Sequence, residues 1–138
     1  MDNSSLNIVT GTVTHGAGYG AQLGFPTANL DAGAFERLKE KPVLGIYAGM
    51  ALLAGDKQEY LAAIVVGQKD HAGVPRVEAH LLDFDGSLYG RELSLTLIRY
   101  LRPFKEFGSE AELKTQIRAD VARVRGTDNK ISRQPRAR

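Results

Sequence analysis

The chain has 138 residues, of which 43% are hydrophobic and 25% charged, and this is the composition of one ordinary globular domain. It has no cysteine, which excludes disulfides and thiolate catalysis and indicates a cytoplasmic protein. No apolar run approaches the roughly 20 residues that cross a bilayer, and the N-terminus lacks the basic and apolar regions of a signal peptide. We therefore expect no membrane partner.

The positive charge of the chain is concentrated at its C-terminal end. The formal net charge is +2 and the pI about 9.0, but residues 126–138 alone carry +3, so residues 1–125 carry about −1. We predict a single domain over 1–125 and a basic, disordered tail over 126–138. The domain lacks the basic, aromatic-studded strands of a nucleic-acid-binding barrel, so we expect no nucleic acid partner.

Five segments have the β-branched and apolar composition of strands. They are residues 6–14, 45–54, 60–66, 76–84 and 92–101. Turn residues at 55–58 and at Asp85 and Gly86 separate neighbouring segments. Many short strands at this spacing predict an antiparallel sheet that closes into a barrel.

One strong helical pattern lies near the end of the chain. Ser109 and Glu112 have the spacing of a capping box, and Gly126 is placed to end the helix. A shorter helix is predicted around residues 34–40, ended by Pro42. The apolar stripe of the long helix consists of Leu113, Ile117, Val121 and Val124.

A glycine-rich segment precedes a short polar one. Gly16, Gly18 and Gly20 alternate, so their backbone N–H groups can approach a phosphate. Thr27 and Asn29 then offer two neutral oxygens of the kind that a hard cation accepts. Neither a dinucleotide-binding fingerprint nor a Walker sequence is present. The alternative interpretation is an ordinary loop.

Glu78 is a carboxylate within an apolar strand. With period-two alternation it points to the same side as Arg76 and His80. Such a carboxylate can act as a general base toward a substrate hydroxyl. The alternative is an outward-facing glutamate paired with Arg76. The three histidines show no metal-site spacing.

The stretch from residue 100 to 107 combines charge with aromatic rings. Arg102 and Lys105 supply positive charge and Phe107 a flat face, which suits an aromatic ring that carries an anionic group. The alternative is a connection in which an aromatic side chain only packs against the helix that follows.

Taken together, these segments resemble the riboflavin kinases of the bacterial and eukaryotic type. Residues 16–30 are similar to that family's glycine loop and P-T-A-N motif, and residues 77–90 to the segment with its catalytic glutamate. The resemblance covers about residues 8–125, and the P-T-A-N motif is its specific part. The match to the closing helix rests on Leu101, Arg102, Pro103, Phe107, Ser109, Leu113, Gln116, Ile117 and Asp120.

This resemblance implies a mainly β protein, a six-stranded antiparallel Greek-key barrel with a C-terminal α-helix packed on its outer face. It implies ATP-dependent phosphorylation of the riboflavin 5′-hydroxyl to FMN, with Glu78 as general base. Thr27 and Asn29 would bind the ATP phosphates and Mg²⁺, or another divalent cation such as Zn²⁺ or Mn²⁺. The other implied contacts are with the ATP phosphates (Gly16, Gly18, Gly20), the adenine and ribose (Leu81, Asp83, Tyr89) and the flavin (Arg102, Lys105, Phe107, Ser109).

The chain departs from the family pattern at two places. Tyr19 and Ala21 stand where members often carry basic residues, and residues 67–73 lack the usual Pro-Thr pair. These departures motivate an alternative, a flavin- or nucleotide-binding regulatory module without catalysis. Because the chain has no room for the adenylyltransferase domain often fused upstream, we expect a protein that makes FMN and not FAD. We also expect a monomer.

Overall fold

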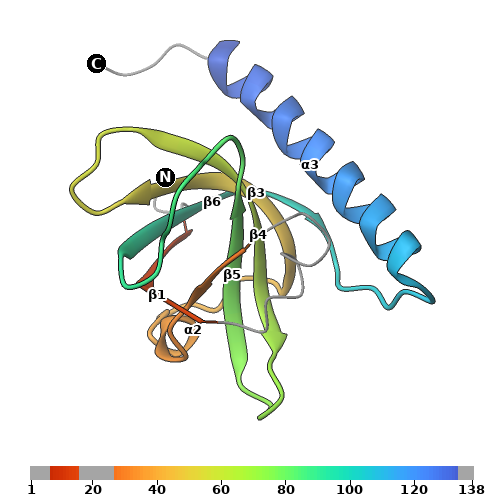
Figure 1. Ribbon diagram of the computed structural model, residues 1–138, viewed down its shortest axis with the longest axis horizontal. Helices are drawn as coiled ribbons and strands as arrows, with labels where there is room; N and C mark the ends of the chain where they lie inside the picture. The colour runs from red at the N-terminus through yellow and green to blue at the C-terminus, as the bar shows by residue number, and fades with distance from the viewer. Residues whose placement is uncertain (1–6, 16–26, 134–138) are drawn as a thin grey trace.

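The computed structural model describes residues 7–15 and 27–133, and these form a closed barrel with a long helix along one side (Figure 1). The strand order around the barrel is β1-β2-β5-β4-β3-β6, and every neighbouring pair is antiparallel. This confirms the predicted six-stranded barrel with a C-terminal helix. The elements are β1 (Asn7–Thr14), β2 (Ala28–Leu30), α2 (Gly33–Glu36), β3 (Gly45–Leu53), β4 (Glu59–Lys69), β5 (Pro75–Leu81), β6 (Glu92–Arg102) and α3 (Glu110–Arg133).

Side chains that alternate between the inside and the outside of the barrel build its core. On β1, Val9 and Val13 are buried whereas Ile8 and Thr12 are exposed, as expected for period two. The interior is filled by aliphatic side chains from all six strands, together with Phe35 of α2. Side chains at the other positions of each strand therefore point outside the barrel, and the candidate site lies on that outer surface.

β2 is a strand of three residues that the sequence patterns did not predict. It pairs with β1 at Thr14↔Asn29 and with β5 at Asn29↔Glu78. The polar segment with Thr27 and Asn29 is thereby inserted between two longer strands.

Gly67 forms a bulge in β4. Val66 pairs with Val77 and Gln68 with Arg76, so Gly67 is an extra residue in β4. Its φ is +90°, a conformation that a side chain would strain. After the bulge, β4 continues into a turn over residues 70–74 whose side chains reach the candidate site.

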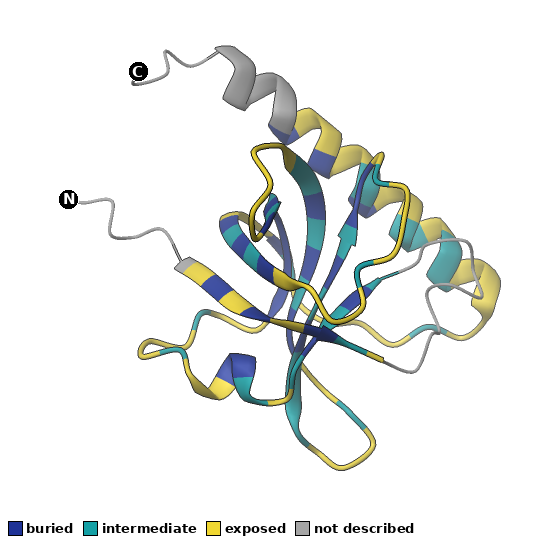
Figure 2. Cartoon of the chain, turned by 60° about the vertical axis from the view of Figure 1, so that its left-hand side comes forward, coloured by how far each residue is buried: buried dark blue, intermediate teal, exposed yellow. Residues whose placement is uncertain are grey.

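α3 begins at the predicted capping box and packs on the outer face of the barrel. The backbone N–H of Glu112 donates to Ser109 Oγ at 3.1 Å, and that of Gly108 donates to Glu112 Oε1 at 2.9 Å. The inner side of the helix is buried or half-buried and the outer side exposed (Figure 2). Val121 and Val124 pack in a second apolar cluster with Ile46, Ala48, Leu61, Ala63, Val65, Leu82 and Leu101.

The expectation that Gly126 ends this helix is wrong, because α3 continues to Arg133. Thr127, on the turn that contains Gly126, is 3% exposed and donates from Oγ1 to the Arg123 carbonyl at 3.1 Å. Packing of this turn outweighs the helix penalty of glycine, about 1 kcal/mol relative to alanine. The division of the chain at residue 125 stays a prediction. α2 ends at Glu36, before the predicted limit. Within residues 7–15 and 27–133, no helix is long and apolar enough to span a bilayer.

Candidate active site

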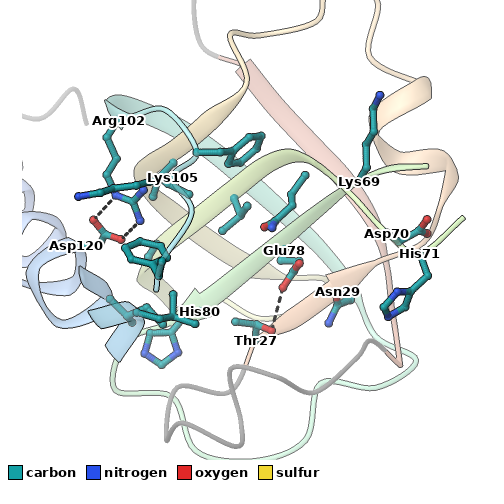
Figure 3. A pocket seen from close by; sticks show the side chains of 18 residues that line it. Thr27, Asn29, Lys69, Asp70, His71, Glu78, His80, Arg102, Lys105 and Asp120 are labelled. Carbon is teal, nitrogen blue, oxygen red and sulfur yellow. Dashed lines mark hydrogen bonds and ion pairs between the residues drawn. The ribbon is translucent and has the colours of Figure 1, made fainter. Parts of the chain in front are cut away.

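A cavity of about 490 Å³ lies between the outer face of the barrel and the first half of α3 (Figure 3). The outward side chains of β2, β4 and β5 form its floor, and α3 and the loop of residues 103–109 form one wall. The turn between β4 and β5 closes the opposite end. Its lining residues are Thr27, Asn29, Ile46, Ala63, Val65, Gln68, Lys69, Asp70, His71, Glu78, His80, Arg102, Phe104, Lys105, Phe107, Leu113, Ile117 and Asp120.

Glu78 points into this cavity because its neighbours on β5 point inward. Val77 and Ala79 are buried in the barrel, so Glu78 leaves the strand on the outer face. Thr27 Oγ1 donates to Glu78 Oε1 at 3.2 Å (Figure 3). Asn29, which pairs with Glu78 across the two strands, lines the same cavity. The structure thus brings together the three residues predicted for the base and the cation.

The environment of Glu78 shifts the pKa of its carboxyl. Burial raises the pKa of its carboxyl above the ordinary value, and this effect exceeds the lowering by the Thr27 hydrogen bond and the Arg76 charge. A carboxylate with a raised pKa binds a proton more readily near neutral pH, which is what proton transfer from an alcohol requires.

The alternative of a surface pair between Glu78 and Arg76 does not fit the contacts of Arg76. Its Nη1 forms an ion pair with Asp70 Oδ2 at 3.1 Å, and its Nη2 donates to the Leu30 carbonyl at 2.8 Å. The Glu78 carboxylate therefore faces the cavity with Thr27 as its hydrogen-bond partner.

Arg102 lines the cavity, but its guanidinium is engaged by α3. Nε and Nη2 donate to the two carboxylate oxygens of Asp120 at 2.9 and 2.7 Å, and Gln116 also donates to Asp120. Asp120 is 4% exposed, so the pair is largely desolvated. Arg102 therefore fixes α3 to the end of β6 and shapes the cavity wall.

The other residues predicted for the flavin side divide into two groups. Lys105 and Phe107 line the cavity, with the Lys105 ammonium 5.8 Å from the centre of the Phe107 ring. Ser109 does not line it, because its hydroxyl caps α3. The predicted contact of Ser109 with the flavin stays a prediction.

A smaller cavity of about 140 Å³ lies on the other side of Thr27. Leu81 and Tyr89, both predicted for the nucleotide, line it, and Thr27 borders both cavities. The Tyr89 ring stacks on His15 with a centroid distance of 4.0 Å. Asp83 lines neither cavity and pairs with Arg125 at 3.0 Å. Gly16, Gly18 and Gly20, with Tyr19 and Ala21, lie outside the described residues.

The donor set around Thr27 and Asn29 suits a hard cation that keeps other ligands. A hydroxyl, an amide and a carboxylate supply oxygen atoms here. Among the described residues, no three histidine or carboxylate side chains gather into a metal cage. This set fits Mg²⁺, which is typically held by one or two protein oxygens together with substrate phosphates.

Several cavity residues were missed by reasoning from sequence. Ile46 and Val65 lie on strands that were predicted, at positions facing outward beneath α3. Lys69 is the last residue of β4, and Asp70 and His71 belong to the turn that follows it. Apolar side chains that point outward from a strand indicate that another element covers them, but they do not identify that element.

Comparisons with known proteins place the chain in a family. A family model described as riboflavin kinase matches residues 6–127. A bifunctional riboflavin kinase/FMN adenylyltransferase of Escherichia coli is 36% identical over 118 residues, which are 85% of this chain and 36% of that protein. A riboflavin kinase of Mus musculus is 32% identical over 114 residues, which are 80% of this chain and 74% of that protein.

The solved structures also show this fold. A riboflavin kinase from Trypanosoma brucei superposes with a TM-score of 0.64 at 23% identity, covering 95% of this chain and 88% of that one. The two chains therefore share a closed barrel with a C-terminal helix. The chain belongs to the riboflavin kinase family. It spans about a third of the length of the bifunctional bacterial relatives.

Proposed function

We propose that this protein transfers the γ-phosphoryl group of ATP to the 5′-hydroxyl of riboflavin, giving FMN and ADP. Family membership supports the reaction. The observation that carries the proposal is Glu78, a base of raised pKa that faces the larger cavity and bonds to Thr27, which borders both cavities.

Riboflavin fits the larger cavity by size and by chemistry. The volume of about 490 Å³ falls in the range of small-molecule sites. Phe104 and Phe107 offer aromatic faces, and Val65 and Ile117 an apolar floor and wall, for the isoalloxazine ring. The ribityl chain would then extend toward Glu78. The nucleotide would occupy the smaller cavity, beside Tyr89.

In this arrangement Glu78 takes the proton of the 5′-hydroxyl as its oxygen bonds to the γ-phosphorus. The bond from that phosphorus to the bridging oxygen breaks, and ADP leaves. Thr27 donates to one carboxylate oxygen of Glu78 and so holds the other available for the substrate proton. A positioned base contributes roughly 10²–10⁴ in rate.

Thr27 and Asn29 are the residues that would hold Mg²⁺ with the ATP phosphates. Such a cation would neutralise the charge that develops on the transferred phosphoryl group. The side chains of the protein contribute orientation, because both oxygens come from a short strand fixed between β1 and β5.

The direct test is an assay of the purified protein with riboflavin, ATP and Mg²⁺, in which FMN and ADP are separated by chromatography. Equal amounts of FMN and ADP are expected. Flavin binding with no release of ADP would instead indicate the regulatory module, and absence of both binding and turnover would overturn the proposal.

A further inference from the structure

Arg76 is a largely buried cation beside the proposed base that the reaction as described does not use. It lies two positions before Glu78 on β5, so both side chains leave the strand on the outer face. The Arg76 side chain is only 19% exposed. Its Nε–H has no acceptor among the described residues, so Nη1 and Nη2 alone hold the guanidinium.

One arm of Arg76 is bonded to the strand that carries Asn29. Nη2 donates to the Leu30 carbonyl at 2.8 Å and to Thr14 Oγ1 at 3.3 Å. The Thr14 hydroxyl in turn donates to the Asn29 carbonyl at 3.3 Å. Arg76 is thereby bonded to β2 directly at the Leu30 carbonyl, and through the Thr14 hydroxyl at the Asn29 carbonyl.

These bonds matter because β2 is short. Its pairing with β5 ends at Asn29↔Glu78. The bond from Arg76 to the Leu30 carbonyl continues the connection one residue further. Without it, only the pairs at Ala28 and Asn29 would fix β2 against β5.

The other arm of Arg76 is bonded to the turn that closes the cavity. Nη1 forms an ion pair with Asp70 Oδ2 at 3.1 Å. Asp70 Oδ1 accepts the backbone N–H groups of Ala72 at 2.9 Å and Val74 at 3.0 Å, so the carboxylate organises the whole turn. Backbone hydrogen bonds of this turn are also the largest effect that lowers the pKa of Asp70.

We propose that Arg76 is a positioning residue of the phosphoryl-transfer site, whose guanidinium holds Asn29 and the 70–74 turn against Glu78 through its bonds to the Leu30 carbonyl and to Asp70. The inference rests on the proposed function. The other titratable or charged groups around this cavity are Lys69, Asp70, His71, His80, Arg102, Lys105 and Asp120.

The chain offers a matched control in Arg37. Its Nη1 also pairs with an aspartate, Asp31, at 2.9 Å, and its Nη2 also donates to a backbone carbonyl, that of Thr10, at 3.0 Å. Arg37 lines neither cavity. Arg76→Gln and Arg37→Gln both remove an ion pair with an aspartate and a bond to a backbone carbonyl, and only Arg76→Gln removes bonds to Leu30 and to the 70–74 turn.

The primary readout is hydrogen exchange of backbone amides in the protein without substrates, followed by NMR. Exchange within residues 28–30 and 70–74 should become faster in Arg76→Gln, because the bonds of the guanidinium to both segments are lost. Exchange in these segments should stay unchanged in Arg37→Gln. These results do not depend on turnover, so they separate this inference from the proposed function.

Kinetics then separate positioning from a loss of the fold. In Arg76→Gln, kcat at neutral pH should fall about 10- to 100-fold, while the KM for riboflavin changes less than about twofold. Arg76→Lys keeps the charge and loses the fork, so it should restore little of this kcat. Unchanged exchange within residues 28–30 and 70–74 in Arg76→Gln would overturn the inference. If Arg76→Gln does not fold, by circular dichroism, the same comparison in Arg76→Lys decides.

Discussion

The Thr27 hydroxyl donates a hydrogen bond to the Glu78 carboxylate at 3.2 Å, although the two residues are 51 positions apart in the chain. This contact exists because β2 and β5 are neighbours in the barrel, paired at Asn29↔Glu78. It joins the segment proposed to hold the cation to the residue proposed as base. The effects of substitutions on the reaction depend on this contact between β2 and β5.

Replacement of the base should abolish most of the activity and leave the fold intact. In Glu78→Gln, kcat should fall about 10²-fold or more, because the amide cannot accept the substrate proton. Glu59→Gln, the same change at an exposed position of β4, is the control and should keep the wild-type rate. A wild-type rate in Glu78→Gln would refute the assignment of the base.

The same substitution should stabilise the protein in a pH-dependent way. Because burial raises the pKa of folded Glu78, its contribution to stability is full below the pKa of the unfolded chain and is lost as pH rises through the folded pKa. Glu78→Gln should therefore have a higher Tm than the wild type at neutral pH and a similar Tm near pH 4. Thermal unfolding from about pH 4 to 8 measures this difference, and a Tm gap independent of pH would contradict it.

Loss of the amide proposed to hold the cation should change the cation requirement. In Asn29→Ala, the Mg²⁺ concentration that gives half-maximal rate should rise at least about tenfold, equivalent to roughly 1.4 kcal/mol. Gln68→Ala, at another position that lines the cavity, is the control and should keep the cation dependence of the wild type. An equal change in both variants would indicate a general loss of the cavity.

Breaking the ion pair between Arg102 and Asp120 should loosen the cavity wall. Asp120→Ala leaves a partly buried guanidinium unpaired, so the free energy of unfolding in urea should fall by about 3–5 kcal/mol. The KM for riboflavin should rise more than the KM for ATP, because α3 borders only the larger cavity. The exposed pair of Asp83 and Arg125 provides the control, and Asp83→Ala should leave the unfolding midpoint nearly unchanged.

A substitution at Gly126 tests where α3 ends. A Cβ added at Gly126 would meet no atom within 4 Å, and the residue lies inside the helix. Gly126→Ala should therefore stabilise the protein by about 0.5–1 kcal/mol. If the helix instead ended at Gly126 in a left-handed conformation, the same change would destabilise it.

Much of the fold follows from local patterns. The strands β1, β3, β4, β5 and β6 were predicted from alternation and β-branched residues, and the start of α3 from its capping box, because these signals depend on neighbours in sequence. β2 was not predicted, since a three-residue strand has too few positions to show a period. Its existence depends on the pairing that β1 and β5 offer on either side.

The candidate site, like the fold, could be predicted from the sequence only in part. The sequence by itself determined which residues had the right chemistry: Glu78 as a carboxylate on an apolar strand, and Thr27 and Asn29 as neutral oxygens after glycines. The tertiary structure decided which of them meet, which environment they share and which are already engaged. Arg102 was predicted to face an anionic group, and only the structure shows that its guanidinium is bonded to Asp120, 18 positions away in the chain. Charge and hydrogen-bonding capacity are properties of one residue, whereas burial and pairing belong to the folded chain and can be assigned only when distant segments are in contact.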